Sequence, residues 1–265
     1  MARIFITGSA DGLGQLAARS LVALGHDVVL HGRNRERAQH ALRAVPGART
    51  ALEGDLASIE ATRALARQAN EAGPFQAVIH NAGIYHPGPG RYETVDGLDD
   101  VFAINAVAPY LLTALIEGPQ RLIYLTSGLH QGGDPDLRDL HWRRRRWSGP
   151  QAYANSKLFD VVLAFAVARL WPHVLSNAVD PGWVPTKMGG LSAPGDLEEG
   201  VATQVWLAVS DERDAKVSGR YFYHERTRVA HPAASDLGVQ NGFLAACEQL
   251  TGVRLASVAA RVVRQ

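Results

Sequence analysis

A tyrosine and a lysine stand four residues apart in the stretch Tyr153-Ala-Asn-Ser-Lys157. The surrounding residues predict a helix, and positions i and i+4 lie on one helical face, so the ammonium can sit beside the phenol. A free tyrosine has a pKa of about 10, and a neighbouring cation favours the phenolate and lowers that value. The pair therefore has the chemistry of a proton donor to a carbonyl, or of a proton acceptor from an alcohol.

A glycine-rich turn follows the first apolar run of the chain. Residues 7–14 read Thr-Gly-Ser-Ala-Asp-Gly-Leu-Gly, spaced G-x-x-x-G-x-G rather than G-x-G-x-x-G. Glycines let the backbone approach a pyrophosphate, and the helix that follows points free N–H groups at the anion. The turn predicts a dinucleotide site, whose candidate contacts are Gly8, Ser9, Asp11, Gly12, Leu13 and Gly14.

The second apolar run ends in His31-Gly32-Arg33-Asn34. NAD-specific Rossmann proteins place an acidic side chain here for the ribose 2′-hydroxyl, and NADP-specific ones place a cation for the 2′-phosphate. Gly32 has no carboxylate, and the guanidinium of Arg33 is suited to phosphate. We therefore expect NADP(H) in preference to NAD(H). The alternative is that Arg33 is simply a solvated residue, like Arg35.

Short apolar segments and amphipathic helices alternate along the chain. Strands that are apolar throughout, each followed by such a helix, indicate a parallel sheet covered on both faces. We expect an α/β fold in which residues 1–265 form a single NAD(P)-binding Rossmann domain, built on one doubly wound parallel sheet. The expected strands lie at 4–6, 28–30, a short segment ending at 54–55, 77–79, 122–125, 177–179 and 221–223.

Irregular insertions near 128–150 and 183–197 interrupt this alternation. Both follow strand ends on the carboxyl side of the sheet, where open α/β folds bind ligands. Long irregular loops in a compact domain are usually functional or mobile. We expect them to form the wall and the lid of a substrate pocket.

Six elements occur along the chain in a fixed order: the turn at 7–14, Asn81-Ala82-Gly83, Asn105, Thr126-Ser127, Tyr153 with Lys157, and Pro181-Gly182. Together they resemble the short-chain dehydrogenase/reductase family, and within it the retinol-dehydrogenase-like and protochlorophyllide-reductase-like members. The resemblance covers nearly the whole chain. It implies an oxidoreductase that interconverts a carbonyl and an alcohol on a small or medium organic substrate, with the hydride chemistry belonging to the cofactor.

The same resemblance implies a role for each matching residue. Tyr153 would be the acid/base, and Lys157 would lower its pKa and hold the nicotinamide ribose. Ser127 would hydrogen-bond the substrate oxygen, and Asn105 would hold a water that extends the proton relay. The other implied cofactor contacts are Asp55 and Leu56 at the adenine, Asn81, Ala82 and Gly83 at the ribose, and Pro181, Gly182 and Thr186 at the nicotinamide.

Ser127 and Tyr153 are 26 residues apart (153 − 127), farther than in the compact members of that family. The intervening residues must loop out for the two side chains to meet. Thr126 is the alternative hydroxyl, disfavoured because alternation along a strand turns it to the other side.

Composition argues against several other classes of function. The formal net charge is +1, which gives no support to a nucleic-acid partner. The run Arg143–Arg146 is therefore interpreted as a solvated patch, or as a contact to an anionic group of the substrate. No His/Cys/Asp cluster has the spacing of metal ligands, so we expect no metal.

The chain also lacks the signals of membrane insertion and export. The apolar helix at 158–171 is too short and too interrupted by charge to span a bilayer, and the N-terminus does not read as a signal peptide. With its single cysteine, Cys247, the sequence predicts a cytoplasmic protein.

The helix at 158–171 carries more apolar surface than one core face requires. A dimer interface and complete burial both explain this pattern, so a homodimer and a monomer are both retained. Two other functions are retained as alternatives: a non-catalytic NADP(H)-binding regulatory or scaffold protein, and a carbon–carbon double-bond reductase of the same family. The joint presence of Ser127, Tyr153, Lys157 and Asn105 favours an enzyme.

Overall fold

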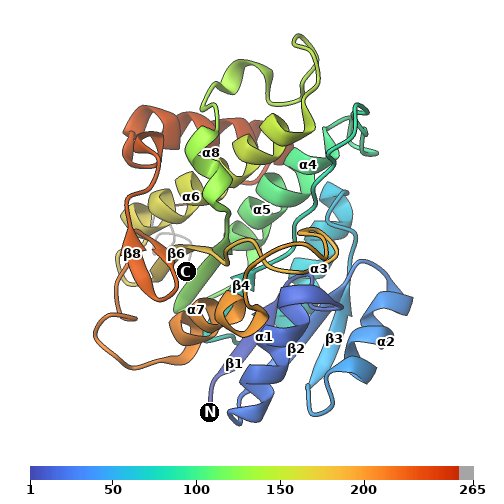
Figure 1. The fold of residues 1–265 in the computed structure, drawn as a ribbon, viewed down its shortest axis with the longest axis vertical. Coiled ribbons are helices and arrows are strands. Elements are labelled where there is room, and N and C mark those ends of the chain that lie inside the picture. Colours follow the sequence, from blue (N-terminus) through green and yellow to red (C-terminus); the bar gives the residue numbers. More distant parts are fainter. Residues whose placement is uncertain (257–265) are drawn as a thin grey trace.

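The computed structural model describes residues 1–256, which are built around an eight-stranded sheet of order β3-β2-β1-β4-β5-β6-β7-β8 (Figure 1). The first seven strands are parallel, and the chain reverses direction across the sheet between β1 and β4, as the predicted doubly wound fold requires. The strands are β1 (Arg3–Ile6), β2 (Asp27–Gly32), β3 (Thr50–Glu53), β4 (Ala77–His80), β5 (Arg121–Leu125), β6 (Leu175–Asp180), β7 (Arg220–Tyr223) and β8 (Arg226–Arg228).

The last strand, β8, is antiparallel to β7 and was not predicted from the sequence. Its residues Arg-Thr-Arg are all exposed and carry no apolar signal. The β7–β8 hairpin turns through His224 and Glu225, whose φ angles of 48° and 58° lie in the left-handed region that tight hairpins use. A charged edge strand of this kind protects the sheet from pairing with other chains.

Helices cover both faces of the sheet (Figure 1). The helices α1 (Gly12–Ala23), α2 (Arg35–Ala44) and α7 (Leu197–Val209) pack on one face. On the other face lie α3 (Ile59–Ala72), α5 (Ala108–Leu115) and α6 (Gly149–Leu170), with α8 (Leu237–Thr251) packed outside α5 and α6. Because successive strand residues point to opposite faces, Ile4 and Ile6 belong to the first core and Phe5 to the second.

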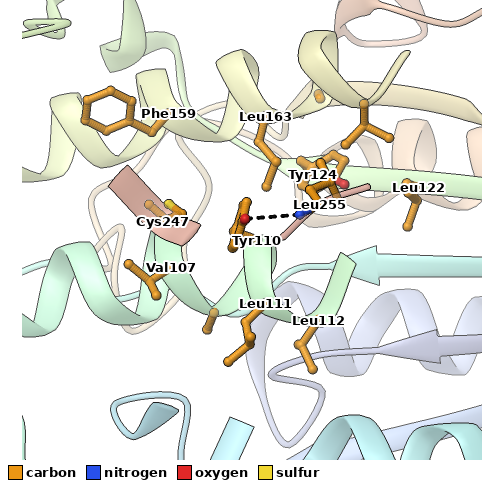
Figure 2. Packing of buried hydrophobic residues seen from close by; sticks show 14 of the residues in the cluster. Val107, Tyr110, Leu111, Leu112, Leu122, Tyr124, Phe159, Leu163, Cys247 and Leu255 are labelled. Carbon is orange, nitrogen blue, oxygen red and sulfur yellow. Dashed lines mark hydrogen bonds between the residues drawn. The ribbon is translucent and has the colours of Figure 1, made fainter. Parts of the chain in front are cut away.

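The apolar surface of α6 is covered within the chain by α8. Phe159 stacks on Phe243 of α8, with ring centroids 4.8 Å apart. Cys247 is fully buried in the same cluster (Figure 2). The Tyr110 hydroxyl donates to the carbonyl of Val253 and accepts from the N–H of Leu255, which ties the segment after α8 to α5. Packing within the chain therefore accounts for most of the apolar pattern of α6, although Phe165 and Leu170 are only partly buried.

Residues 100–115 form one continuous helix whose hydrogen-bond pattern changes in the middle. It begins as α4 (Asp100–Phe102), widens into a π-helical turn at Ala103–Val107, and continues as α5. Pro109 has no N–H, so the carbonyl of Asn105 lacks the donor that an α-helix would supply. The wider turn that results places the fully buried Asn105 side chain towards the site described below.

The insertion at 128–150 is irregular apart from short 3₁₀ turns at Gly128–Gly132 and Leu137–Asp139, and the chain from 183 is irregular up to α7. The carboxylate of Asp139 accepts the backbone N–H groups of Arg143, Arg144 and Arg145. Arg145 also lies 3.9 Å from the centroid of the Trp142 ring. The backbone of the arginine run is thus held by its own loop, while the side chain of Arg143 donates to the carbonyl of Gly97. None of the helices among residues 1–256 has the length and hydropathy needed to cross a bilayer.

Candidate active site

The carboxyl ends of the strands open into an elongated cavity of about 390 Å³ beside the glycine-rich turn. Asn81 fixes this turn, because its Nδ2 donates to the carbonyls of Thr7 and Gly8 at 2.9 and 3.1 Å. A Cβ on Gly8 would lie 2.8 Å from Cα of Ala82, and one on Gly14 would lie 2.4 Å from Nδ2 of Asn81. Neither position admits a side chain. The glycine-rich turn therefore lets backbone N–H groups approach a pyrophosphate without side chains in between.

Most of the predicted cofactor contacts line this cavity, namely Gly8, Asp11, Gly12, Leu13, Arg33, Asp55, Leu56, Asn81, Ala82, Gly83, Tyr153, Lys157, Pro181 and Thr186. Ser9 does not reach it, because its N–H donates to the carbonyl of His31 and its hydroxyl to that of Ile6. Gly14 packs against Asn81, and Gly182 lines a neighbouring cavity instead.

His31 of β2 stabilises the same turn. Its Nδ1 accepts from the N–H of Gly8 at 3.0 Å, which leaves Nε2 to donate to the carbonyl of Gly54 at 2.8 Å. Burial is the largest cause that lowers the pKa of His31, to about 4. A neutral ring is required here, since a protonated Nδ1 would face the Gly8 N–H as a second donor.

We expect His31 to remain neutral at pH 5, as a single tautomer with the proton on Nε2. The folded pKa lies below the unfolded value, so the ring's contribution to stability is fully present above about pH 6.5 and is lost as the pH falls towards 4. Long-range ¹⁵N–¹H NMR of the imidazole reports both the tautomer and the titration. Protonation of this ring with a midpoint above about pH 6 would contradict the assignment.

Basic side chains gather at the far end of the cavity, beyond β2. Arg33 is exposed there, while Arg37 and Lys187 both contact Oδ2 of Asp11, at 2.7 and 2.9 Å. Because Lys187 belongs to the insertion at 183–197, this ion pair ties the insertion to the glycine-rich turn. A Cβ on Gly32 would lie 2.3 Å from the backbone N of Ala38. An acidic residue therefore cannot occupy position 32 without moving α2.

Lys157 of α6 is held in a buried ion pair. Its Nζ donates to Oδ2 of Asp160 at 2.8 Å and to the carbonyl of Leu125 at 2.7 Å. The side chains of Lys157 and Asp160 are only 5% and 3% exposed. Burial raises the pKa of Asp160 to about 7. For Lys157, burial disfavours the cation, but the charges of Asp160 and Tyr153 raise its pKa overall.

The pKa of Tyr153 is raised, which is opposite to the direction expected from Lys157 alone. Burial is the largest cause, and the charges of Asp160 and Asp180 raise the pKa further, whereas Lys157 and a hydrogen bond with Ser127 lower it. Lys157 has less influence than expected because Asp160 balances its charge. At neutral pH Tyr153 is therefore a phenol, which is the form that donates a proton.

Ser127 and Tyr153 line the same cavity in spite of the long insertion between them. The insertion folds back onto the start of α6, where the N–H of Asp134 donates to Oδ1 of Asn155 at 2.8 Å. Thr126 is buried and its hydroxyl donates to the carbonyl of Lys157 at 2.7 Å. Thr126 thus positions α6, and the choice of Ser127 as the hydroxyl that faces the cavity is consistent with the geometry.

Asn105 sits behind this pair and is bonded through both side-chain atoms. Its Oδ1 accepts from the N–H of Ile84 at 2.8 Å, and its Nδ2 donates to the carbonyl of Ile84 and to Oγ of Ser156, both at 3.0 Å. These bonds join the loop after β4 to α6. The water-holding role implied by the family resemblance stays a prediction.

A second cavity, of about 610 Å³, adjoins the first at Tyr153. Ser127 and Gly182 line it. The Tyr153 hydroxyl contacts Sδ of Met188 at 3.7 Å, and the ring of Tyr85 lies 5.0 Å from that of Tyr153. The residues shared by both cavities are Leu13, Thr126, Tyr153, Pro181, Thr186 and Met188. The tyrosine therefore stands where the two cavities join.

Four charged residues of the site were not identified from the sequence. Two of them could have been identified from their positions in the sequence. Asp160 lies three residues after Lys157 on the same helix face, and Asp180 directly precedes Pro181-Gly182. Arg37 and Lys187 could not have been identified in this way, since exposed basic residues are common and only the fold brings both to Asp11.

A sheet of this order with a bare-backbone turn after β1 defines a dinucleotide-binding Rossmann protein, and the comparisons narrow that class. The family model described as short chain dehydrogenase matches residues 2–117. An uncharacterized oxidoreductase of Emericella nidulans is 44% identical and covers 96% of this chain and 98% of its own. The short-chain dehydrogenase chry4 of Gibberella zeae is 43% identical, covering 97% and 100%. The chain belongs to the short-chain dehydrogenase family.

The chain is also similar to more distant proteins. Retinol dehydrogenase 13 of Homo sapiens is 28% identical over 96% of this chain and 86% of its own length. A crystal structure of an uncharacterized Mycobacterium paratuberculosis protein superposes with a TM-score of 0.82, at 27% identity, over 96% of this chain and 95% of that one. The retinol-dehydrogenase-like resemblance is confirmed.

Proposed function

We propose that the chain is an NADP(H)-dependent reductase that converts a carbonyl of a small or medium organic substrate to an alcohol. One observation carries the proposal: the Tyr153 phenol, with Ser127 and Lys157 beside it, stands where the cofactor-shaped cavity meets the second cavity. Membership of an oxidoreductase family supports the reaction class.

The residues of the first cavity fit a nicotinamide dinucleotide. The backbone of the glycine-rich turn would hold the pyrophosphate, Asp55 and Leu56 the adenine, and Asn81–Gly83 with Lys157 the riboses. Pro181 and Thr186 would flank the nicotinamide. When bound, the nicotinamide supplies the hydride in reduction or accepts it in oxidation.

Residues of the chain donate the proton to the substrate oxygen and stabilise the negative charge that develops on it. The Ser127 hydroxyl donates a hydrogen bond to the carbonyl oxygen and stabilises the negative charge that develops there. Tyr153 gives its phenolic proton to the same oxygen as the carbonyl carbon is reduced. The Lys157 ammonium stabilises the phenolate that remains until a solvent proton replaces the one transferred. The raised pKa of Tyr153 suits this direction, because the residue starts protonated.

The preference for NADP(H) is proposed from the end of β2. Position 32 has no room for a carboxylate, and Arg33 lies at the cavity with an exposed guanidinium. Guanidinium groups bind phosphate through paired hydrogen bonds. Arg37 is less available, because it is already bonded to Asp11.

Arg33→Ala is expected to weaken NADPH binding by about 10- to 100-fold, the range for loss of a charge-assisted hydrogen bond, and to leave NADH binding nearly unchanged. Isothermal titration of both cofactors measures this. Arg35→Ala is the matched control, since Arg35 is exposed two residues further on, at the start of α2, but does not line the cavity. Tighter binding of NADH than of NADPH by the unaltered protein would refute the preference.

The proposed reaction is tested by NADPH oxidation against a panel of aldehydes, ketones, quinones and enones, with product analysis. Carbonyl reduction that Tyr153→Phe abolishes supports the proposal. Saturation of the enone double bond with the carbonyl left intact would favour a double-bond reductase. Tight NADPH binding without turnover of any substrate would favour a binding protein.

A further inference from the structure

The second cavity contains one carboxylate among otherwise uncharged side chains. Of the lining residues in the described part of the chain, Asp180 alone carries a formal charge. The others are apolar, aromatic, hydroxyl-bearing or glycine, namely Leu13, Tyr85, Thr126, Ser127, Gly128, Leu129, Tyr153, Pro181, Gly182, Trp183, Val184, Thr186, Met188, Gly189 and Tyr223. Burying a charge in such surroundings costs free energy unless hydrogen bonds or an opposite charge compensate for it.

Asp180 is the last residue of β6 and is only 8% exposed. Its Oδ1 accepts from the N–H of Gly182 at 2.9 Å, and its Oδ2 accepts from the Tyr221 hydroxyl at 3.1 Å. Within residues 1–256 no lysine, arginine or histidine lies in ion-pair contact with it. A carboxylate oxygen has two lone pairs, so each oxygen keeps one acceptor position after these bonds.

Gly128 approaches this carboxylate closely. A Cβ on Gly128 would lie 3.1 Å from Oδ2 of Asp180, so a side chain at this position would crowd the group. Aromatic rings line the same cavity at Tyr85, Trp183 and Tyr223, and Trp183 is 61% exposed. Ring faces attract cations, so these side chains and the carboxylate favour the same kind of group.

We propose that the carbonyl substrate also carries a protonated amine, which donates a charge-assisted hydrogen bond to Asp180. The aromatic side chains of the cavity would enclose an apolar part of the substrate that contains a ring. The inference rests on the proposed function, which supplies the requirement for a carbonyl group. The requirement for a positively charged amine comes from Asp180 alone. The two requirements together define the substrate class as amino-substituted aromatic ketones or aldehydes.

The test measures binding and turnover separately. Binding to the NADP⁺ complex is measured by titration calorimetry with phenethylammonium and with 2-phenylethanol, which differ in the cationic group. Turnover with NADPH is measured for the three ring isomers of aminomethyl-acetophenone and of ethyl-acetophenone. Asp180→Asn is the main variant, because an amide can still accept from Gly182 through its oxygen and donate to Tyr221 through its nitrogen.

We expect the ammonium ligand to bind about 10- to 100-fold more tightly than the alcohol, the range for a charge-assisted hydrogen bond, and Asp180→Asn to remove that difference without weakening the alcohol. Glu198→Gln, which neutralises an exposed carboxylate of α7 outside the cavity, should leave the difference intact. Equal affinity for both ligands, or an unchanged preference in Asp180→Asn, overturns the inference. Absence of ketone turnover together with ammonium selectivity would instead count against the proposed function alone.

Discussion

Replacing Tyr153 with phenylalanine is expected to lower kcat for carbonyl reduction by about 10³-fold, within the range that a positioned general acid contributes. The reason is that, of the described residues that line both cavities, Tyr153 alone is a phenol. The folded state should survive, because the ring's packing against Tyr85 remains and the hydroxyl's contact with Met188 is weak at 3.7 Å. NADPH binding, measured by calorimetry, should change little.

The matched control is Tyr85→Phe, which removes a hydroxyl from the same cavity without touching the proton donor. It should retain kcat within a few-fold. Equal losses in the two variants would mean that packing, not proton transfer, accounts for the effect.

The pH dependence provides a further check on Tyr153. Reduction needs the phenol, and its pKa is raised above 10.0, so kcat/KM should not fall between about pH 6 and pH 9 on account of this residue. A decline in kcat/KM with a midpoint below about pH 9 that Tyr153→Phe removes would contradict the raised pKa of Tyr153.

The parts of the site that the sequence predicted depend on local chemistry. Gly8 and Gly14 are read directly from the sequence. The structure shows that a Cβ at either position would lie within 3 Å of atoms of Ala82 or Asn81, so only glycine fits there. Tyr153 and Lys157 are likewise fixed relative to each other by one helix. Most of the strands also followed from local pattern, because β1, β2, β4, β5 and β6 are buried on both faces. The strand β3 at the edge of the sheet has one buried residue and a weaker pattern.

The parts that the sequence did not predict depend on contacts between distant segments or on burial. The direction of the Tyr153 pKa shift depends on how deeply the phenol is buried and on Asp180, which arrives from another strand. The strand β8 has no apolar residues to mark it. The π-helical turn at Asn105 had a local cause in Pro109, but a proline inside a helical pattern more often signals a kink or an end. Ser9 was predicted to contact the cofactor because it lies within the glycine-rich turn. In the structure its hydroxyl bonds to the carbonyl of Ile6 and the N–H of His31 and does not line the cavity.

Asp160→Asn is expected to lower kcat/KM by about 10- to 100-fold through Lys157, since misplacing a catalytic group by about 1 Å has an effect of this size. Asp160 does not line either cavity and therefore acts as a positioning residue. Its carboxylate and the carbonyl of Leu125 hold the ammonium in one place, 5.8 Å from the centroid of the Tyr153 ring. The amide of asparagine is nearly the same size, so the variant removes charge with little change of shape.

A double-mutant cycle with Lys157→Met distinguishes this role from a general loss of stability. Each single variant leaves one uncompensated charge or polar group in a site only 3–5% exposed, and breaking such a pair costs about 3–5 kcal/mol of unfolding free energy. The double variant removes both charges, so in urea denaturation it should be more stable than either single variant. Its kcat/KM should equal that of Lys157→Met alone, because Asp160 has no further effect once the ammonium is gone. Losses in kcat/KM that add across the cycle would show that Asp160 acts on the reaction independently of Lys157.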